Sequence, residues 1–153
     1  MKKSILKSII YASVIIISAI VIYDTNVPNN IVCRSSFKTI SIKKNVNVSL
    51  NISYTLGDHD GWINLKGTFH NDGVVSSVAR KVYVDVIKVG NSIKIRSKRN
   101  LLLDTDNSDT IELKKYLAQT YLNPGLDMDV FVYPQNGGGY IFFTNDMHIS
   151  YCQ

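Results

Sequence analysis

An uncharged apolar run near the N-terminus constrains this chain more than any other feature, because it decides where the remaining residues fold. Lys7 is the only charged residue between Ile5 and Tyr23, and no charge occurs from Ser8 to Tyr23. A helix of about nineteen residues crosses roughly 30 Å of hydrocarbon at about 1.5 Å per residue. The long side chain of Lys7 can reach back to the interface. The run therefore predicts a membrane-spanning signal-anchor at residues 5–23.

The charges on the two sides of the run predict its orientation. Lys2, Lys3 and Lys7 precede the uncharged stretch, and Asp24 is the first charge after it. Basic residues favour the cytoplasmic side, so the N-terminus is expected in the cytoplasm and the rest of the chain outside. The expected organisation is a cytoplasmic stub at 1–4, the span at 5–23, a linker at 24–31 and one exported domain at 32–153.

A cleaved signal, a lipid anchor and a buried helix each fit the run less well than a span does. A cleaved signal peptide needs small residues behind its apolar stretch, but residues 20–23 are Ile, Val, Ile and Tyr. Lipidation at Cys33 is disfavoured because Asn, Ile and Val precede that cysteine. A buried helix of a soluble protein would show an amphipathic pattern, which is absent here. A cleaved signal and a buried helix are the remaining alternatives.

The charge of the whole chain overstates the basicity of its exported part. The chain has 17 Lys and Arg against 12 Asp and Glu. Three of the lysines precede the run, which leaves 14 basic against 12 acidic residues beyond it, a difference of 2. Such a balance is not the footprint of a nucleic-acid-binding domain. Together with the predicted export, it excludes direct binding to nucleic acid.

Cys33 and Cys152 are the two cysteines of the chain. An isolated pair in an oxidising compartment favours a disulfide. Closing a loop of about 120 residues would stabilise the fold by very roughly 5 kcal/mol. Two unpaired thiols are the alternative. No C-x-x-C spacing suggests a redox pair, and the scattered His59, His70 and His148 do not complete a zinc site.

Alternating apolar and polar side chains predict strands in the exported part. From Val46 to Thr55 every second residue is apolar and the others are Asn, Ser or Thr. This period is typical of a strand with one wet face. Similar runs are separated by the turn sequences GDHDG, NDG, GNS and PQNGGG, at residues 57–61, 71–73, 90–92 and 134–139. We expect an α+β domain that is mainly antiparallel β, with seven or eight strands in a curled sheet or partly open barrel and one helix.

The single predicted helix precedes the last strands. Asp109 and Glu112 form an Asp-x-x-Glu capping pattern at its start. The apolar residues that follow have helical spacing: Leu113, Tyr116, Leu117 and Tyr121. Asn-Pro-Gly at residues 123–125 ends the pattern.

A sheet of seven or eight strands in so small a domain must curl on itself or leave strand edges open. One helix can cover one end or one face of such a sheet, but not both. We therefore expect an edge that is available to a partner.

No motif predicts catalysis. Asp58, His59 and Asp60 lie in a short turn between glycines, which favours a solvated turn over a ligand set. The NGGGY stretch lacks the Lys-Ser/Thr and the helix start of a phosphate-binding loop. Glu112 is the only glutamate of the chain, and no Ser/His/Asp order fits a nucleophile elbow. The sequence predicts a protein that is not an enzyme and needs no metal or cofactor.

Two surfaces are candidate binding faces. The first is apolar and is expected to lie in the core or, if the barrel is incomplete, to line a ligand cavity shared with a partner: Val82, Val84, Val86, Leu126, Met128 and Val130. The second is basic, because Lys94, Arg96 and Lys98 alternate along one predicted strand and share a face. It is expected to be solvated, or to meet an acidic partner or lipid headgroups.

The order of these parts resembles the FidL-like membrane proteins. The resemblance rests on the basic N-terminus and anchor, on Cys33 soon after it, on GWINLKG at 61–67, on Arg80 opening RKVYVDV, and on Cys152. In general plan the chain is also similar to the ToxS, PsaF and VtrC kind of single-span companions of ToxR-type regulators.

This resemblance implies an accessory role at the bacterial inner membrane. Such regulators carry a cytoplasmic winged-helix DNA-binding domain, one span and a periplasmic domain, and the companion binds that periplasmic domain. The implied function is to stabilise or activate the regulator, with a joint site for a small amphipathic ligand such as a bile salt. The alternatives are a stand-alone periplasmic binder of a small ligand or lipid, and an assembly or chaperone factor for a fimbria or secretion system.

Overall fold

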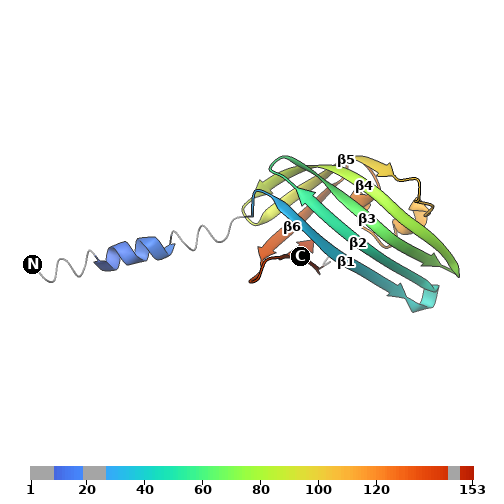
Figure 1. Cartoon of the computed structure of the whole chain (residues 1–153), viewed down its shortest axis with the longest axis horizontal. Coiled ribbons are helices and arrows are strands. Elements are labelled where there is room, and N and C mark those ends of the chain that lie inside the picture. Colours follow the sequence, from blue (N-terminus) through green and yellow to red (C-terminus); the bar gives the residue numbers. More distant parts are fainter. Residues whose placement is uncertain (1–8, 19–26, 145–148) are drawn as a thin grey trace, which may run out of the picture.

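The computed structural model describes residues 9–18, 27–144 and 149–153. Its main element is one antiparallel sheet in which eight strands follow one another in sequence order. The strands are β1 (Ile31–Ser41), β2 (Val46–Leu56), β3 (Asp60–Asn71), β4 (Val74–Val89), β5 (Ser92–Leu102), β6 (Asp127–Pro134), β7 (Tyr140–Thr144) and β8 (Ile149–Cys152). The sheet curls until it is nearly closed into a barrel (Figure 1). The prediction of a mainly antiparallel β domain with seven or eight strands is confirmed.

Two glycines on β3 lie where no side chain would fit against β2. A Cβ atom at Gly67 would lie 2.0 Å from the carbonyl oxygen of Ser49, and one at Gly61 would lie 2.3 Å from that of Thr55. The backbones of β2 and β3 therefore approach each other more closely at these two points than any side chain would allow. A β-bulge between Tyr83 and Val84 adds further twist to the β4–β5 pair.

The barrel interior is filled by the apolar residues that alternate along each strand. Ile63, Leu65, Val82 and Ile95 are fully buried, and their polar neighbours face outward. Burial of an aliphatic side chain of this size contributes about 1.5 to 3 kcal/mol before the entropy of ordering is counted. The alternation read from the sequence thus separates the inner face of the sheet from its outer face.

The connection between β5 and β6 covers one part of the barrel, but its helix is shorter than predicted. Helix α2 (Thr110–Leu113) has a single turn, and the 3₁₀ helix η2 (Gln119–Tyr121) follows it. Asp109 caps α2 as predicted, since its carboxylate accepts the Ile111 N–H at 2.7 Å. Ala118 has a ψ of 131°, which interrupts any continuous helix.

The break in this connection has a packing reason. A straight helix over residues 110–122 would extend about 20 Å and would move its last turn away from the curved sheet. The two turns instead place Leu113, Leu117 and Tyr121 in the core, where each is at most 7 % exposed. Glu112 does not return to the cap but binds Lys115, with Nζ and Oε1 2.6 Å apart.

A buried ionic cluster fastens the start of this connection to the middle of β4. The side chains of Arg80 and Asp106 are 1 % and 0 % exposed, and Arg80 Nε lies 2.8 Å from Asp106 Oδ2. Arg80 Nη2 also donates to Ser108 Oγ and Thr110 Oγ1. The Ala79 N–H donates to the same carboxylate at 2.9 Å. Every charged group of the cluster therefore has partners, as burial requires.

Near the N-terminus, residues 9–18 are helical. Their large apolar side chains are 54 to 71 % exposed: Ile9, Ile10, Tyr11, Val14, Ile15, Ile16 and Ile17. Among the described residues, no helix has both the length and the apolar character that crossing a membrane requires. Much of the predicted span, 5–8 and 19–23, lies outside the described residues.

Candidate functional site

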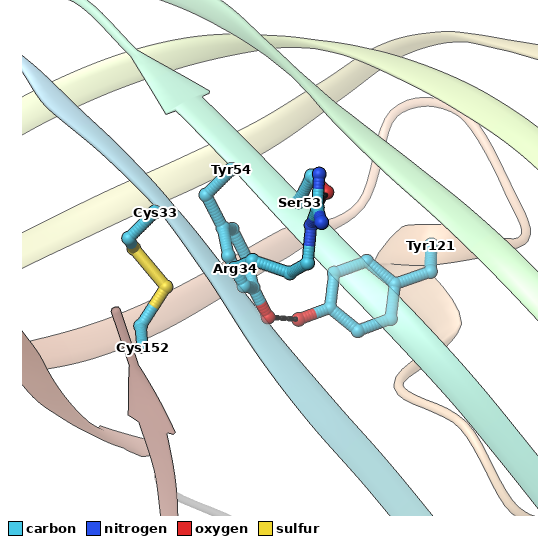
Figure 2. Close-up of a disulfide and its surroundings, with 6 residues drawn as sticks. All are labelled: Cys33, Arg34, Ser53, Tyr54, Tyr121 and Cys152. Carbon is cyan, nitrogen blue, oxygen red and sulfur yellow. Dashed lines mark hydrogen bonds between the residues drawn. A yellow bond between two sulfur atoms is a disulfide. The ribbon is translucent and has the colours of Figure 1, made fainter.

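The first and last strands of the sheet meet at one end of a seam. The Arg34 N–H donates to the Gln153 carbonyl at 2.7 Å, and the Gln153 N–H donates back to the Arg34 carbonyl at 3.0 Å. Directly beside this pair, Cys33 and Cys152 form a disulfide (Figure 2). The predicted bridge is confirmed. It joins residues 119 positions apart and closes this end of the seam covalently.

Beyond this point the seam opens. Along a strand, the backbone N–H and C=O groups of successive residues point alternately to its two edges. The pairing of Arg34 with Gln153 therefore shows which residues of β1 and β8 direct these groups toward the seam. On β1 the N–H and C=O groups of Ser36, Lys38 and Ile40 face the seam. Those of Ile149 and Tyr151 face it from β8. Within the described ranges, no backbone hydrogen bond joins these two edges beyond Arg34.

A pocket of about 260 Å³ lies under the open part of the seam. One lip is formed by β1 from Ser35 to Thr39, and the other by Thr144, Ile149 and Ser150. The remaining wall is mostly apolar or aromatic and comes from β2, β6, β7 and the connection after α2: Ile52, Tyr54, Tyr116, Leu117, Ala118, Tyr121, Met128, Val130 and Phe142. A concave, mostly apolar space with a small number of polar groups is the usual form of a small-molecule site, and the pocket has this form on its inner side.

Three tyrosines belong to this wall, and two of them, Tyr54 and Tyr121, form a hydrogen-bonded pair. The hydroxyls of Tyr54 on β2 and Tyr121 in η2 are 2.9 Å apart, and both side chains are buried (Figure 2). The Phe142 ring packs edge-on against Tyr54, with centroids 5.0 Å apart. Burial raises the pKa of both phenols above the ordinary value. Both therefore remain neutral hydrogen-bond donors at physiological pH.

The pair leaves one donor unused. Two phenols carry two protons, and the bond between them uses only one. Neither hydroxyl has another hydrogen-bond partner within the described part of the chain. The hydroxyl of Thr144, on the lip of the same pocket, is also buried without a partner among the described residues. Buried polar groups without partners are uncommon in folded proteins, and a bound molecule can supply the missing partner of the tyrosine pair.

The predicted apolar face is divided between the core and the pocket. Val82, Val84 and Val86 are at most 2 % exposed and lie in the barrel core. Met128 and Val130 line the pocket. Leu126 lies just before β6 and is 37 % exposed.

The predicted basic residues lie on the outer face of β5 and are exposed. Arg96 Nε is 2.6 Å from Asp127 Oδ1, and Lys98 Nζ is 2.8 Å from Asp85 Oδ1. These acidic neighbours on β6 and β4 neutralise much of the charge of the face. The structure does not bring this face together with the pocket.

The remaining candidates also lie apart from the pocket. Asp58, His59 and Asp60 are exposed in the turn between β2 and β3, and Asp58 lies 3.2 Å from Lys88 Nζ. The residues that sequence reasoning missed are Tyr54 and Tyr121. Tyr54 occupies an inward position of an alternating strand, and a hydroxyl at such a position is a visible signal. Its partner, 67 positions later, could not be read from the sequence.

Comparison with known proteins gives one match. Residues 30–152 match the family model described as the YqeJ C-terminal domain. This range contains all eight strands, both cysteines and every residue of the pocket wall. No curated protein and no solved structure matches the chain. None of these comparisons identifies a FidL-like or ToxS-type family, so that resemblance stays a prediction.

Proposed function

The chain belongs to the YqeJ C-terminal domain family, and from this premise we propose that it is a membrane-anchored accessory protein. In this proposal the barrel lies in the periplasm and binds the periplasmic domain of a ToxR-like transcription regulator. Binding stabilises or activates the regulator. A domain in the periplasm can influence transcription only through a partner that also reaches the cytoplasm.

The observation that carries this proposal is the seam-facing edge of β1, which pairs with no described strand beyond Arg34. Ser36, Lys38 and Ile40 present backbone donors and acceptors to the open seam, and none of them has a ladder partner there among the described residues. An unpaired strand edge is a template for an extended segment of another chain. Main-chain hydrogen bonds would supply affinity, and alternate side chains of the added strand would face the pocket.

Two further features support the membrane and periplasmic parts of the proposal. The helical residues 9–18 carry no charge and expose large apolar side chains around the helix, as expected for a helix that needs an apolar environment. The Cys33–Cys152 disulfide fits an oxidising compartment. The resemblance to FidL-like proteins and to ToxS-type companions agrees with both.

The edge can be tested with two substitutions at one position. Lys38→Pro removes a backbone N–H that faces the seam and leaves the bonds between β1 and β2 in place, since those come from its neighbours. Lys38→Ala removes the same side chain but keeps the N–H. Full-length wild type and both variants are recovered from native membranes, and co-purifying proteins are identified by mass spectrometry.

We expect a single-span regulator with wild type and Lys38→Ala, and its loss with Lys38→Pro. The regulator should also have a shorter lifetime in cells that lack this chain. Equal regulator levels and activity with and without the chain would refute the proposal. Recovery of pilins or secretion components instead would indicate an assembly factor. A disulfide and an unfolding transition like those of wild type establish that Lys38→Pro is folded.

The pocket favours a second candidate function, a stand-alone binder of a small apolar ligand. It is formed entirely by this chain and does not need a partner to be enclosed on most sides. Stoichiometric binding of a hydrophobic molecule by a protein that recovers no regulator from native membranes would favour this alternative.

A further inference from the structure

We propose that the seam pocket binds a neutral, mainly apolar small molecule with a single hydrogen-bond-accepting oxygen, and that the Tyr54–Tyr121 pair recognises this oxygen. The inference rests on the proposed function in one respect: the pocket lies under the edge of β1 where the partner is expected to dock. It concerns this chain alone, so it can be tested without a partner.

The hydrogen-bond count favours an acceptor in the ligand. After the bond between Tyr54 and Tyr121, one phenolic proton has no acceptor among the described residues, although both side chains are at most 7 % exposed. Thr144 lines the same pocket, but its hydroxyl is buried and is not accessible to a molecule in the pocket. A carbonyl or ether oxygen accepts from either tyrosine hydroxyl and needs no proton of its own.

The electrostatics of the wall require that this acceptor be neutral. Within the described part of the chain, the only cationic side chain that lines the pocket is Lys38, and it is exposed on the β1 lip. An ionised carboxylate held against the two phenols would be desolvated without a counter-charge, which is strongly unfavourable. A ketone, ester or ether oxygen carries a much smaller desolvation penalty and suits a site of neutral donors.

The size of the pocket limits the rest of the ligand. Its 260 Å³ is larger than an engineered cavity of about 150 Å³ that holds benzene. It is smaller than the range that begins at about 300 Å³ for drug-sized ligands. At protein-like packing density it holds about 10 to 14 non-hydrogen atoms. One ring with a short chain, or a single medium-length acyl chain, fits this volume.

The test uses two probes that differ only in the oxygen. Butyrophenone and butylbenzene have the same carbon skeleton, and the first carries a carbonyl where the second has a methylene. The full chain is reconstituted in lipid nanodiscs with ¹³C-methyl methionine, and each probe is titrated against the methionine signals. The chain has three methionines, and Met128 lines the pocket and reports its occupancy. Empty nanodiscs give the free probe concentration.

We expect wild type to bind butyrophenone about 5- to 10-fold more tightly than butylbenzene, the effect of about one net hydrogen bond. The critical variant is Tyr54→Phe with Tyr121→Phe, because either tyrosine alone would still offer a proton. In this double variant the preference should fall to about 1, while butylbenzene binds as in wild type. Binding of butylbenzene thus shows that the variant retains its pocket. Tyr133→Phe, on an exposed side chain of β6 that does not line the pocket, is the matched control.

Three results would overturn the inference. The first is equal affinity of wild type for both probes, and the second is no shift of the Met128 signal with either. The third is binding of 4-phenylbutyrate, which carries a carboxylate, at least as tight as that of butyrophenone. A wild-type preference for butyrophenone together with failure to recover a regulator would instead support the ligand site and refute the proposed partner.

Discussion

Two of the regions in which the barrel buries polar side chains differ in how their hydrogen bonds are satisfied. In the Arg80–Asp106 cluster, the guanidinium and the carboxylate bond to each other and to Ser108, Thr110 and the backbone of β4. In the Tyr54–Tyr121 pair, each hydroxyl has only the other as a partner among the described residues. Both regions are shielded from solvent.

This difference indicates that the Arg80–Asp106 cluster holds the fold together, whereas the Tyr54–Tyr121 pair is suited to contact a ligand. The buried ion pair fixes the position of the connection between β5 and β6, and both of its charged groups have partners within the chain. A buried donor without an acceptor adds little to the stability of the fold, but it provides a specific contact for a molecule that enters the pocket. Changes to the disulfide, to the ion pair and to the tyrosines test this division.

Removal of the disulfide should lower the free energy of unfolding more than any other change. Its local effect should be on the strands beside the pocket. Cys33→Ser with Cys152→Ser opens a loop of 119 positions, which lowers the free energy of unfolding by about 5 kcal/mol in the chain-entropy model. Denaturant unfolding of the full chain measures this loss. Hydrogen exchange should show that β8 loses protection while β4 keeps it. A loss below about 1 kcal/mol would show that the barrel closes without the bridge.

Arg80→Met should destabilise the other region strongly. It leaves the Asp106 carboxylate buried without its counter-charge, and breaking a buried pair in this way costs about 3 to 5 kcal/mol. Arg96→Met is the matched control, because the Arg96–Asp127 pair lies on the surface and its loss should change stability little. Similar unfolding midpoints for the two variants would contradict the structural role of the cluster.

The same cluster should make stability depend on pH. Burial alone would raise the pKa of Asp106, but the hydrogen bonds from Arg80, from Ser108 and from the Ala79 N–H outweigh it and hold this pKa below the ordinary value. The group therefore contributes stability above its unfolded pKa of about 3.9, and this contribution is lost as the pH falls through the lower folded pKa. Urea unfolding between pH 6 and pH 2 measures the loss.

Asp106→Asn should flatten this acid dependence, and Asp127→Asn is its control. The hydrogen bond from Arg96 also lowers the pKa of Asp127, but this carboxylate is at the surface, where solvent and salt weaken the effect. An acid profile of Asp106→Asn that matches wild type would show that other groups govern the pH dependence.

The smallest effect on stability is expected from the tyrosine pair. Tyr54→Phe with Tyr121→Phe replaces both partners of one hydrogen bond by apolar rings of the same shape, which is often close to neutral. We expect the free energy of unfolding to change by less than about 1 kcal/mol. A loss of unfolding free energy as large as that of Arg80→Met would show that the tyrosine pair also holds the barrel together. The two regions would then not differ in role.

Much of the fold could be predicted from the sequence, because the signals that define it are local. The period of two from Val46 to Thr55 predicts β2 and its inward residues, and the structure buries Val48, Leu50 and Ile52. The Asn-Asp-Gly turn predicts the β3–β4 hairpin, and Asp72 and Gly73 have the positive φ values that such a turn requires. Asp109 caps α2 for the same local reason.

The helical spacing from Leu113 to Tyr121 predicted one helix and was wrong about its length. Helical spacing indicates only that the apolar residues face the same side of their segment. Two short turns against a curved surface meet that condition as well as a straight helix does. The curvature of the sheet against which these turns pack is set by other strands, outside the segment itself.

The strand-forming residues, the inward side of each strand and the two cysteines available to pair follow from the sequence alone. The pairing of Arg34 with Gln153 without further β1–β8 pairing among the described residues, the contact of Tyr54 with Tyr121 and the contact of Asp106 with Arg80 depend on the three-dimensional fold. The reason is that φ, ψ and side-chain direction follow from neighbouring residues. Closure of a barrel depends on twist summed over all eight strands, and no single segment carries that sum.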